Sequence, residues 1–130
     1  MDHPVTATIG KDHYETKMRF GKHELIADEP EHIGGTDKGP SAGTFLKMSL
    51  AACTAITLRM YADRKGWEVE EFIVKVDFHR QDEVTHFERT VEVKGKLDEK
   101  QRKRILQIAN LCPIHKTLSG PIEIETKLVE

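Results

Sequence analysis

The chain has 130 residues, 38% of them hydrophobic, and its 20 lysines and arginines almost balance its 22 aspartates and glutamates. This length and composition are typical of one globular domain over residues 1–130, and the small net charge excludes non-specific binding of nucleic acid through a basic surface. No apolar run reaches the roughly 18 residues of a membrane span, and the first four residues do not resemble a signal peptide. We therefore expect a soluble, cytoplasmic protein that does not bind membranes.

The N-terminal third combines short strands with a glycine-rich loop. Residues 4–28 alternate weakly and break at two turns, which predicts two or three short strands, with 13–19 and 23–28 forming a hairpin across Gly21. The loop over 29–40 places glycines before a helix, as phosphate-binding loops do, but its spacing does not match their motif. We interpret it as a lid or an entrance loop of an active site.

A long helix is predicted over Ala42–Lys65, because this stretch is rich in alanine, leucine and methionine and stops at Gly66. Ser41 is the expected N-cap residue. Residues 46–58 are apolar on nearly every face of such a helix. A helix of this kind is buried on all sides, either in a core or at a subunit interface.

Two strands and a second helix are predicted next. Period-two alternation over 72–78 and 87–97, with one solvated side, indicates antiparallel strands joined by a turn at 81–85. Asp98, with a glutamine three residues on, predicts a capping box and a helix that ends near Asn110.

The C-terminal part begins at a Cys-Pro pair. Proline is favourable at the first helical position, so Cys112 takes the N-cap position of a short helix through Leu118. Alternating apolar and polar residues over 122–128 predict a last strand.

The two cysteines, Cys53 and Cys112, carry the most distinctive chemistry. Cys53 lies within the long helix among apolar neighbours, a setting that raises the pKa of a thiol and leaves it inert unless a cation or a hydrogen-bond donor reaches it. The helix N-terminus at Cys112 favours a thiolate. If folding brings the two thiols together, one can attack an oxidant and the other can resolve the sulfenic acid as a disulfide. The alternative is that both are small hydrophobic residues of the core.

The seven histidines raise the question of a metal site. Cys112 and His115 have a ligand-like spacing, and His13, His23 and His32 lie in the N-terminal third. No pair-plus-pair pattern of ligands is present, so we rank metal binding below thiol chemistry.

Two blocks of sequence carry a resemblance to a known family. The first is Gly-Gly-Thr-Asp-Lys-Gly-Pro-Ser at 34–41, followed by Leu-Ala-Ala-Cys-Thr-Ala-Ile-Thr at 50–57, and the second is Leu-Cys-Pro-Ile-His-Lys-Thr-Leu at 111–118. Together, in this order, they resemble the OsmC/Ohr family of hydroperoxide-detoxifying proteins, and in particular its shorter OsmC-like branch. The predicted order of elements agrees with that family over essentially the whole chain.

The resemblance implies an α+β fold that forms an intertwined homodimer, with two long central helices wrapped by antiparallel β-sheets. It implies that Cys53 is the peroxidatic thiol and Cys112 the resolving thiol, in a pocket at the dimer interface. Members hold the thiolate with an arginine from the N-terminal hairpin, for which Arg19 is the best match. They reduce organic hydroperoxides or hydrogen peroxide in oxidative-stress defence without a cofactor. Thiol reductants, which are lipoyl-type for some members, return their cysteines to the reduced state.

The sequence departs from the family at one position. Peroxidase members carry a glutamate near the start of the long helix that orients the arginine, and Gly43 occupies the matching position here. One interpretation is that a carboxylate of the preceding loop replaces it: Asp28, Glu29, Glu31 or Asp37. Another is a weakly active or non-catalytic relative that binds a small apolar or thiol-containing ligand at the dimer interface. A third is a structural dimer whose cysteines belong to the core.

Overall fold

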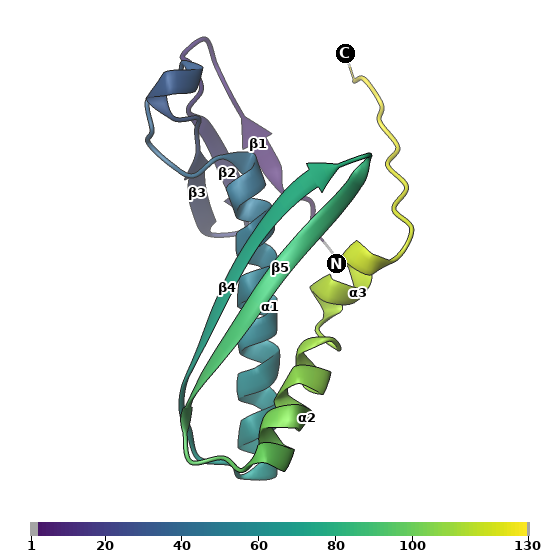
Figure 1. Cartoon of the computed structure of the whole chain (residues 1–130). Helices are drawn as coiled ribbons and strands as arrows, with labels where there is room; N and C mark the ends of the chain where they lie inside the picture. Colours follow the sequence, from purple (N-terminus) through teal and green to yellow (C-terminus); the bar gives the residue numbers. More distant parts are fainter. Residues whose placement is uncertain (1–2, 130) are drawn as a thin grey trace. The chain divides into compact units, whose positions relative to one another are not determined.

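The computed structural model describes residues 3–129. The residues outside this range are Met1, Asp2 and Glu130. The expectations for the N-terminus and for a domain over 1–130 include these residues. The chain forms two compact units, one up to Leu46 and one from Lys47 onward, and each is described by itself. The elements in Figure 1 are β1 (Thr6–Thr8), β2 (Thr16–Phe20), β3 (His23–Ala27), the 3-10 turn η1 (Glu31–Ile33), α1 (Ala42–Lys65), β4 (Val69–Gln81), β5 (Val84–Gly95), α2 (Glu99–Ala109) and α3 (Pro113–Ser119).

The first unit contains a three-stranded antiparallel sheet in the order β1-β2-β3. The predicted hairpin is confirmed: β2 and β3 pair from Thr16 opposite Ala27 to Phe20 opposite His23. Gly21 has a φ of 58° at the turn, a left-handed conformation that glycine adopts without steric cost.

The buried carboxylate of Asp28 organises the loop that follows the sheet. It accepts hydrogen bonds from the backbone N–H groups of Tyr14 (3.1 Å), Glu29 (2.7 Å) and Lys38 (3.1 Å) and from the hydroxyl of Thr36 (2.8 Å). Burial alone would raise the pKa of Asp28, but these donors outweigh burial and hold the pKa far below its ordinary value. Asp28 is therefore a structural anion of the loop.

Two glycines let this loop fold tightly on itself. A Cβ atom at Gly35 would collide with the backbone carbonyl of Glu29, and one at Gly39 would collide with the carbonyl of Ile26. The glycine-rich composition of the loop is thus explained by close backbone packing.

Helix α1 has the predicted bounds, and its predicted cap is present. The Ser41 hydroxyl accepts a hydrogen bond from the backbone N–H of Thr44 at 3.3 Å. One face, which carries Leu50, Thr54, Leu58 and Tyr61, is buried. Exposed apolar side chains lie elsewhere on the same helix, so the protein's own chain does not cover it on all sides.

No helix within residues 3–129 is both long enough and apolar enough to cross a membrane.

The second unit contains a long two-stranded hairpin of β4 and β5. The strands pair from Val69 to the tip at Gln81 opposite Val84, so they extend further toward the turn than the alternation over 72–78 and 87–97 predicts. The turn consists of Asp82 and Glu83 alone, both with positive φ angles (53° and 64°), a two-residue geometry that matches the twist of a hairpin.

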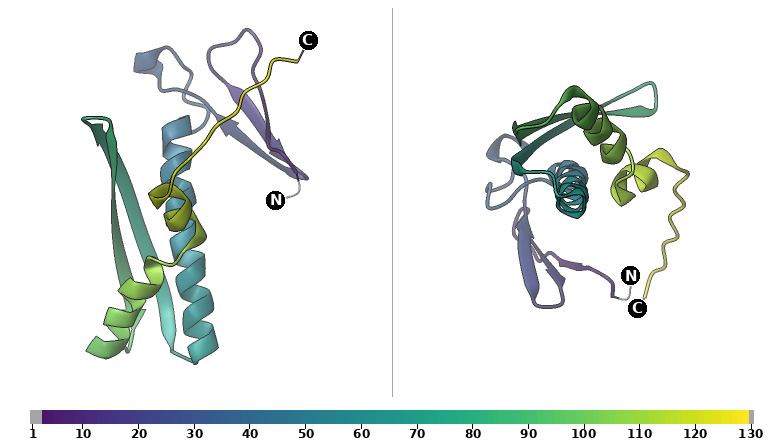
Figure 2. Two further views of the ribbon diagram at one scale, coloured as in Figure 1. Left: turned by 90° about the vertical axis from the view of Figure 1, so that its right-hand side faces the viewer. Right: turned by 90° about the horizontal axis from the view of Figure 1, so that it is seen from below.

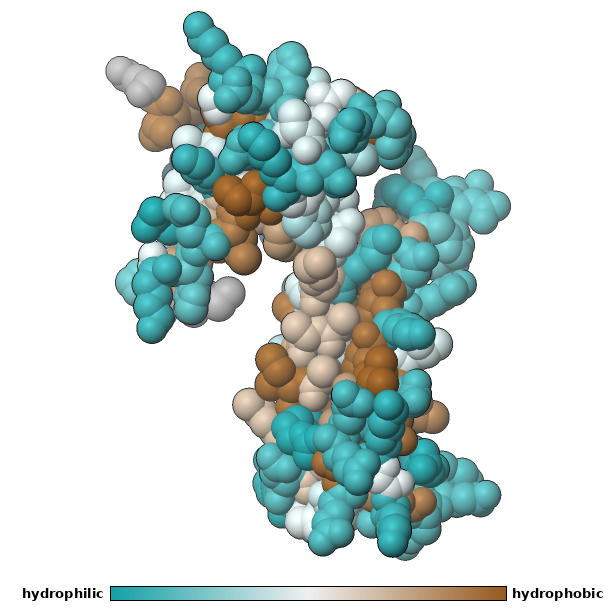
Figure 3. Space-filling model, turned by 90° about the vertical axis from the view of Figure 1, so that its left-hand side faces the viewer, coloured by the Kyte–Doolittle hydropathy of each residue, from teal (hydrophilic) through white to brown (hydrophobic). Residues whose placement is uncertain are grey.

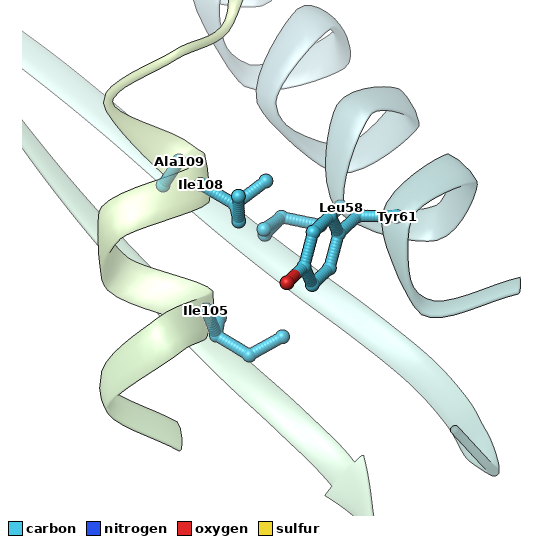
Figure 4. Close-up of a cluster of buried hydrophobic side chains, with 5 residues drawn as sticks. All are labelled: Leu58, Tyr61, Ile105, Ile108 and Ala109. Atoms are coloured by element: carbon cyan, nitrogen blue, oxygen red, sulfur yellow. The ribbon is translucent and has the colours of Figure 1, made fainter. Parts of the chain in front are cut away.

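The core of the second unit lies where α1 and α2 pack against the hairpin (Figures 1 and 2). Its buried members, drawn in Figure 4, are Leu58, Tyr61, Ile105, Ile108 and Ala109. Trp67, Phe72, Val91, Val93 and Leu97 pack around them. The predicted capping box of α2 is confirmed, since Asp98 accepts from the Gln101 N–H while the Gln101 side chain accepts from the Asp98 N–H.

The strand predicted over 122–128 is wrong. Residues 121–129 carry no strand, and Ile124 and Leu128 are 84% and 99% exposed. Alternation predicts a strand only where a partner strand supplies the hydrogen bonds of a ladder, and the described part of the chain supplies none to this segment.

Candidate functional site

The second unit brings its two cysteines together, although they are far apart in the sequence. Cys53 lies in the middle of α1, and Cys112 is the N-cap residue of α3. The backbone N–H of Ile114 donates to the Cys53 Sγ at 3.5 Å, while the Thr54 hydroxyl lies 3.7 Å from the Cys112 Sγ. Both cysteines are free thiols, and each influences the pKa of the other.

Cys112 is the thiol that this environment favours as an anion. Its side chain is fully buried, and its Sγ accepts a hydrogen bond from the backbone N–H of His115 at 3.3 Å. Burial alone would raise the pKa of Cys112. Hydrogen bonds from His115, Thr54 and Cys53, together with the positive charge of Arg89, outweigh burial and lower it. The backbone N–H at this helix N-terminus thus lowers the pKa of the Cys112 thiol, which is the direction expected from the Cys-Pro pair.

Cys53 is the more accessible of the two sulfurs and the more strongly protonated. Its side chain is half-buried, whereas that of Cys112 is fully buried. Burial raises the pKa of Cys53 and the neighbouring Cys112 raises it further, although the N–H of Ile114 acts in the opposite direction. Of the two thiols, Cys112 is therefore the one that ionises more readily.

Arg89 is a candidate site residue that the sequence reasoning did not select. It lies on β5 and its guanidinium donates to the Thr54 hydroxyl at 3.1 Å, to the Asn110 side-chain oxygen at 2.9 Å and to the His115 Nδ1 at 3.0 Å. All three acceptors are uncharged, so they do not neutralise the positive charge of Arg89. This charge lowers the pKa of the Cys112 thiol. The signal was present, because Arg89 is the polar residue on the otherwise apolar inward face of its strand.

His115 takes part in the same network in its neutral form. Its Nδ1 accepts from Arg89, which can only donate. Burial lowers the pKa of His115 and the charge of Arg89 lowers it further, so the ring is unprotonated at neutral pH.

A cavity of about 300 Å³ opens beside this network. Arg89 and His115 contribute its polar wall, and Leu50, Phe87 and Leu118 contribute its apolar wall. A cavity of this kind fits a small molecule with an apolar body and a polar reactive group.

Arg19 lies in the first unit, on β2. Its exposed guanidinium forms an ion pair with Glu24 at 2.7 Å. Glu24 is not among the loop carboxylates considered as replacements for the acid missing at Gly43. One of those loop carboxylates, Asp28, is fully engaged by its own loop.

The described residues, 3–129, contain no group of three or more histidines, cysteines or carboxylates that could hold a metal ion. Cys112 and His115 have a ligand-like spacing. The His115 N–H donates to the Cys112 Sγ, and the His115 ring bonds to Arg89.

The fold and the site define an α+β protein in which a long helix and a short capped helix present a thiol pair to an arginine. The chain belongs to the OsmC-like protein family, whose family model matches residues 35–127. The resemblance and the α+β class predicted from the sequence are thereby confirmed.

Solved structures of related proteins share the fold. An OsmC-like protein from Mycoplasma pneumoniae is 23% identical, with 92% of this chain and 90% of that chain covered and a TM-score of 0.78. An organic hydroperoxide resistance protein from Elizabethkingia anophelis is 20% identical, with 95% and 94% covered and a TM-score of 0.65. Another from Legionella pneumophila, also described as a predicted redox protein, is 18% identical, with 90% and 88% covered and a TM-score of 0.62. No curated protein matches the chain in sequence.

Proposed function

We propose that this protein is a cytoplasmic thiol-dependent peroxidase that reduces organic hydroperoxides or hydrogen peroxide by a two-cysteine mechanism. The observation that carries the proposal is the contact network that joins Cys53 and Cys112 to Arg89 beside a cavity of about 300 Å³. Two relatives of the same fold are named organic hydroperoxide resistance proteins, which supports the same class of substrate.

In the first step, Cys53 attacks the peroxide, while Cys112 accepts the Cys53 proton and then donates it to the leaving group. The Cys53 proton passes to the Cys112 sulfur, and the Cys53 thiolate attacks the terminal oxygen of the hydroperoxide. An S–O bond forms as the O–O bond breaks, so sulfur is oxidised by two electrons and the peroxide is reduced. The leaving alkoxide takes the proton from Cys112 and departs as an alcohol. Cys53 is left as a sulfenic acid and Cys112 as a thiolate.

In the second step, Cys112 resolves the sulfenic acid. Its thiolate attacks the Cys53 sulfur, a disulfide forms, and the hydroxyl leaves as water with a proton from solvent. An external thiol reductant, a lipoyl-type dithiol being one candidate, then reduces the disulfide and is itself oxidised. The half-exposed Cys53 suits the thiol that meets substrate. Cys112 is buried, but its hydrogen bonds lower its pKa, which suits the thiol that attacks in the second step.

Two arginines have distinct roles in this proposal. Arg89 keeps Cys112 in its thiolate form. Arg19 is the candidate, from the family resemblance, for the cation that stabilises the Cys53 thiolate. With Gly43 in place of an acid, Glu24 is the carboxylate that holds the Arg19 side chain.

The first test of this function is disulfide formation. After treatment with one equivalent of an organic hydroperoxide, we expect mass spectrometry of the alkylated, digested protein to find Cys53 linked to Cys112 in most molecules. Reduction with a dithiol should restore both free thiols. Thiols that remain unmodified, or that are overoxidised without forming the link, would contradict the two-cysteine mechanism and favour a non-catalytic relative whose cavity binds a small ligand.

We also propose that two copies form a homodimer through α1. Three large apolar side chains on this helix, Met48, Ile56 and Met60, are 46%, 54% and 64% exposed in the single chain. Figure 3, in which apolar residues are brown, shows such side chains gathered along the helix. A second copy would remove this apolar area from water, which is the main driving force of protein association.

The oligomeric state tests this interface. We expect the wild-type protein to have the mass of a dimer in light scattering, and Ile56→Glu to shift it toward the monomer because the interface would bury an unpaired carboxylate. Leu106→Glu is the matched control, since Leu106 is a similarly exposed apolar residue on α2. A wild-type monomer, or an Ile56→Glu protein that remains a dimer, would argue against this interface.

A further inference from the structure

A second cavity lies in the same unit, away from the thiols. Its volume is about 420 Å³, and it lies between the C-terminal end of α1 and the first turns of α2. Four cationic side chains line it: Lys65, Lys100, Lys103 and Arg104. We call this the cationic cleft. It shares no lining residue with the cavity beside the thiols, so the two are separate.

The positive charge of the cationic cleft is poorly neutralised by the protein. Asp98 is the carboxylate among its lining residues, and it accepts the Gln101 N–H in the capping box of α2. Arg104 donates to two uncharged groups, the Tyr61 hydroxyl at 3.0 Å and the side-chain oxygen of Gln107 at 2.8 Å. The cleft therefore presents several cations whose mutual repulsion an anion would relieve.

Cationic side chains cluster around the ring of Tyr61. The cationic groups of Arg64, Lys65 and Arg104 lie 5.8, 5.8 and 5.6 Å from the centre of its ring. The hydrogen bond from Arg104, aided by the charges of Lys65 and Arg64, lowers the pKa of the Tyr61 hydroxyl against the effect of its burial. The same field that favours a tyrosinate favours any other anion in this position.

The cleft also offers an aromatic surface. The indole of Trp67 lines it and meets the Tyr61 ring edge-on, with ring centres 5.4 Å apart and planes at 79°. Trp67 is half-buried, so part of its ring faces the cleft. Aromatic ligands stack on surfaces of this kind, and phosphate groups are bound by lysine and arginine.

We propose that the cationic cleft binds a small organic polyphosphate, whose phosphates contact Lys100, Lys103 and Arg104 and whose aromatic ring packs on Trp67. The cluster of cations supplies the affinity for several negative charges, and the indole distinguishes a ring-bearing ligand from a simple polyanion. The volume of the cleft accommodates a nucleotide-sized molecule.

The test uses Trp67 as its own reporter, because it is the single tryptophan of the chain. We expect ATP to change the tryptophan fluorescence of the full chain with a saturable curve at low ionic strength, and the affinity to fall as salt is raised. Tripolyphosphate, which carries the charge without the ring, should bind at least about 5-fold more weakly. Equal affinities for the two probes would overturn the ring contact.

Matched charge variants complete the test. Lys100→Gln/Lys103→Gln should weaken ATP binding at least about 10-fold, whereas Lys17→Gln/Lys75→Gln removes the same charge from exposed lysines outside the cleft and should leave affinity within about 2-fold of wild type. Thermal unfolding without ligand shows whether each variant is folded. Absence of a saturable response to both probes, or equal loss in the two double variants, would overturn the proposal. Neither result bears on disulfide formation by the cysteines.

Discussion

Replacing Cys53 with serine is expected to lower hydroperoxide reduction by at least ~10³-fold, because a hydroxyl is not ionised at neutral pH and cannot replace the attacking thiolate. Cys112→Ser should behave differently. The Cys53 sulfenic acid still forms, more slowly without the Cys112 sulfur as a proton acceptor, and then persists because nothing resolves it. Peroxide consumption measures turnover, and a sulfenic-acid trap followed by mass spectrometry measures the intermediate.

The two single variants together decide the order of attack. The proposed order requires a trapped sulfenic acid at Cys53 in the Cys112→Ser protein and no trapped species at Cys112 in the Cys53→Ser protein. The reverse pattern would mean that Cys112 attacks first, which its lowered pKa would favour if its complete burial were relieved during turnover. Circular dichroism of both variants provides the control for folding, since serine is close to cysteine in size.

Replacing Arg89 with glutamine is expected to have the second-largest effect. The charge of Arg89 contributes to the lowered pKa of Cys112, so its removal should move that pKa upward and leave less thiolate at neutral pH. In a Cys53→Ser background, the rate of Cys112 alkylation against pH should shift to more alkaline pH. We expect the rate at pH 7 to fall, because a smaller fraction of Cys112 is then in the reactive thiolate form.

The matched variants separate charge from structure. Arg89→Lys keeps the positive charge and should restore part of the shift, although lysine cannot reproduce the three guanidinium hydrogen bonds. Arg102→Gln, which removes an exposed arginine of α2, should leave the alkylation profile of Cys112 unchanged. Arg19→Gln should also leave it unchanged while slowing peroxide reduction, because Arg19 is proposed to act at Cys53. An Arg89→Gln profile equal to that of wild type would remove Arg89 from the mechanism.

Elements with strong local signals could be predicted from the sequence. The bounds of α1 follow from a stretch rich in alanine, leucine and methionine between Ser41 and Gly66, which has no proline and a single glycine, Gly43. The start of α2 follows from the reciprocal side-chain-to-backbone hydrogen bonds between Asp98 and Gln101. The N-cap position of Cys112 follows from Pro113. In each case the groups that form the feature are within a few residues of one another, so their geometry depends little on the rest of the chain.

Features that need distant partners could not be derived in this way. The alternation over 122–128 predicts a strand, but the segment forms none, because a strand exists only where another strand pairs with it. The polar residue at position 89 was visible on an apolar face of β5, but its three acceptors come from α1, α3 and the end of α2.

By itself, the sequence determined the helices, their caps, the hairpins and the helix-terminal setting of one thiol, because hydrogen bonds between near neighbours and short hydrophobic periods dictate these. The tertiary structure alone decided that α3 packs on α1 so that both sulfurs share one network, that Arg89 is the cation of that network, and that lysines from two helices converge around Tyr61. The physical reason is that electrostatic and hydrogen-bond effects on a thiol or an anion depend on separations of a few ångströms, which sequence spacing does not encode once the partners lie on different elements.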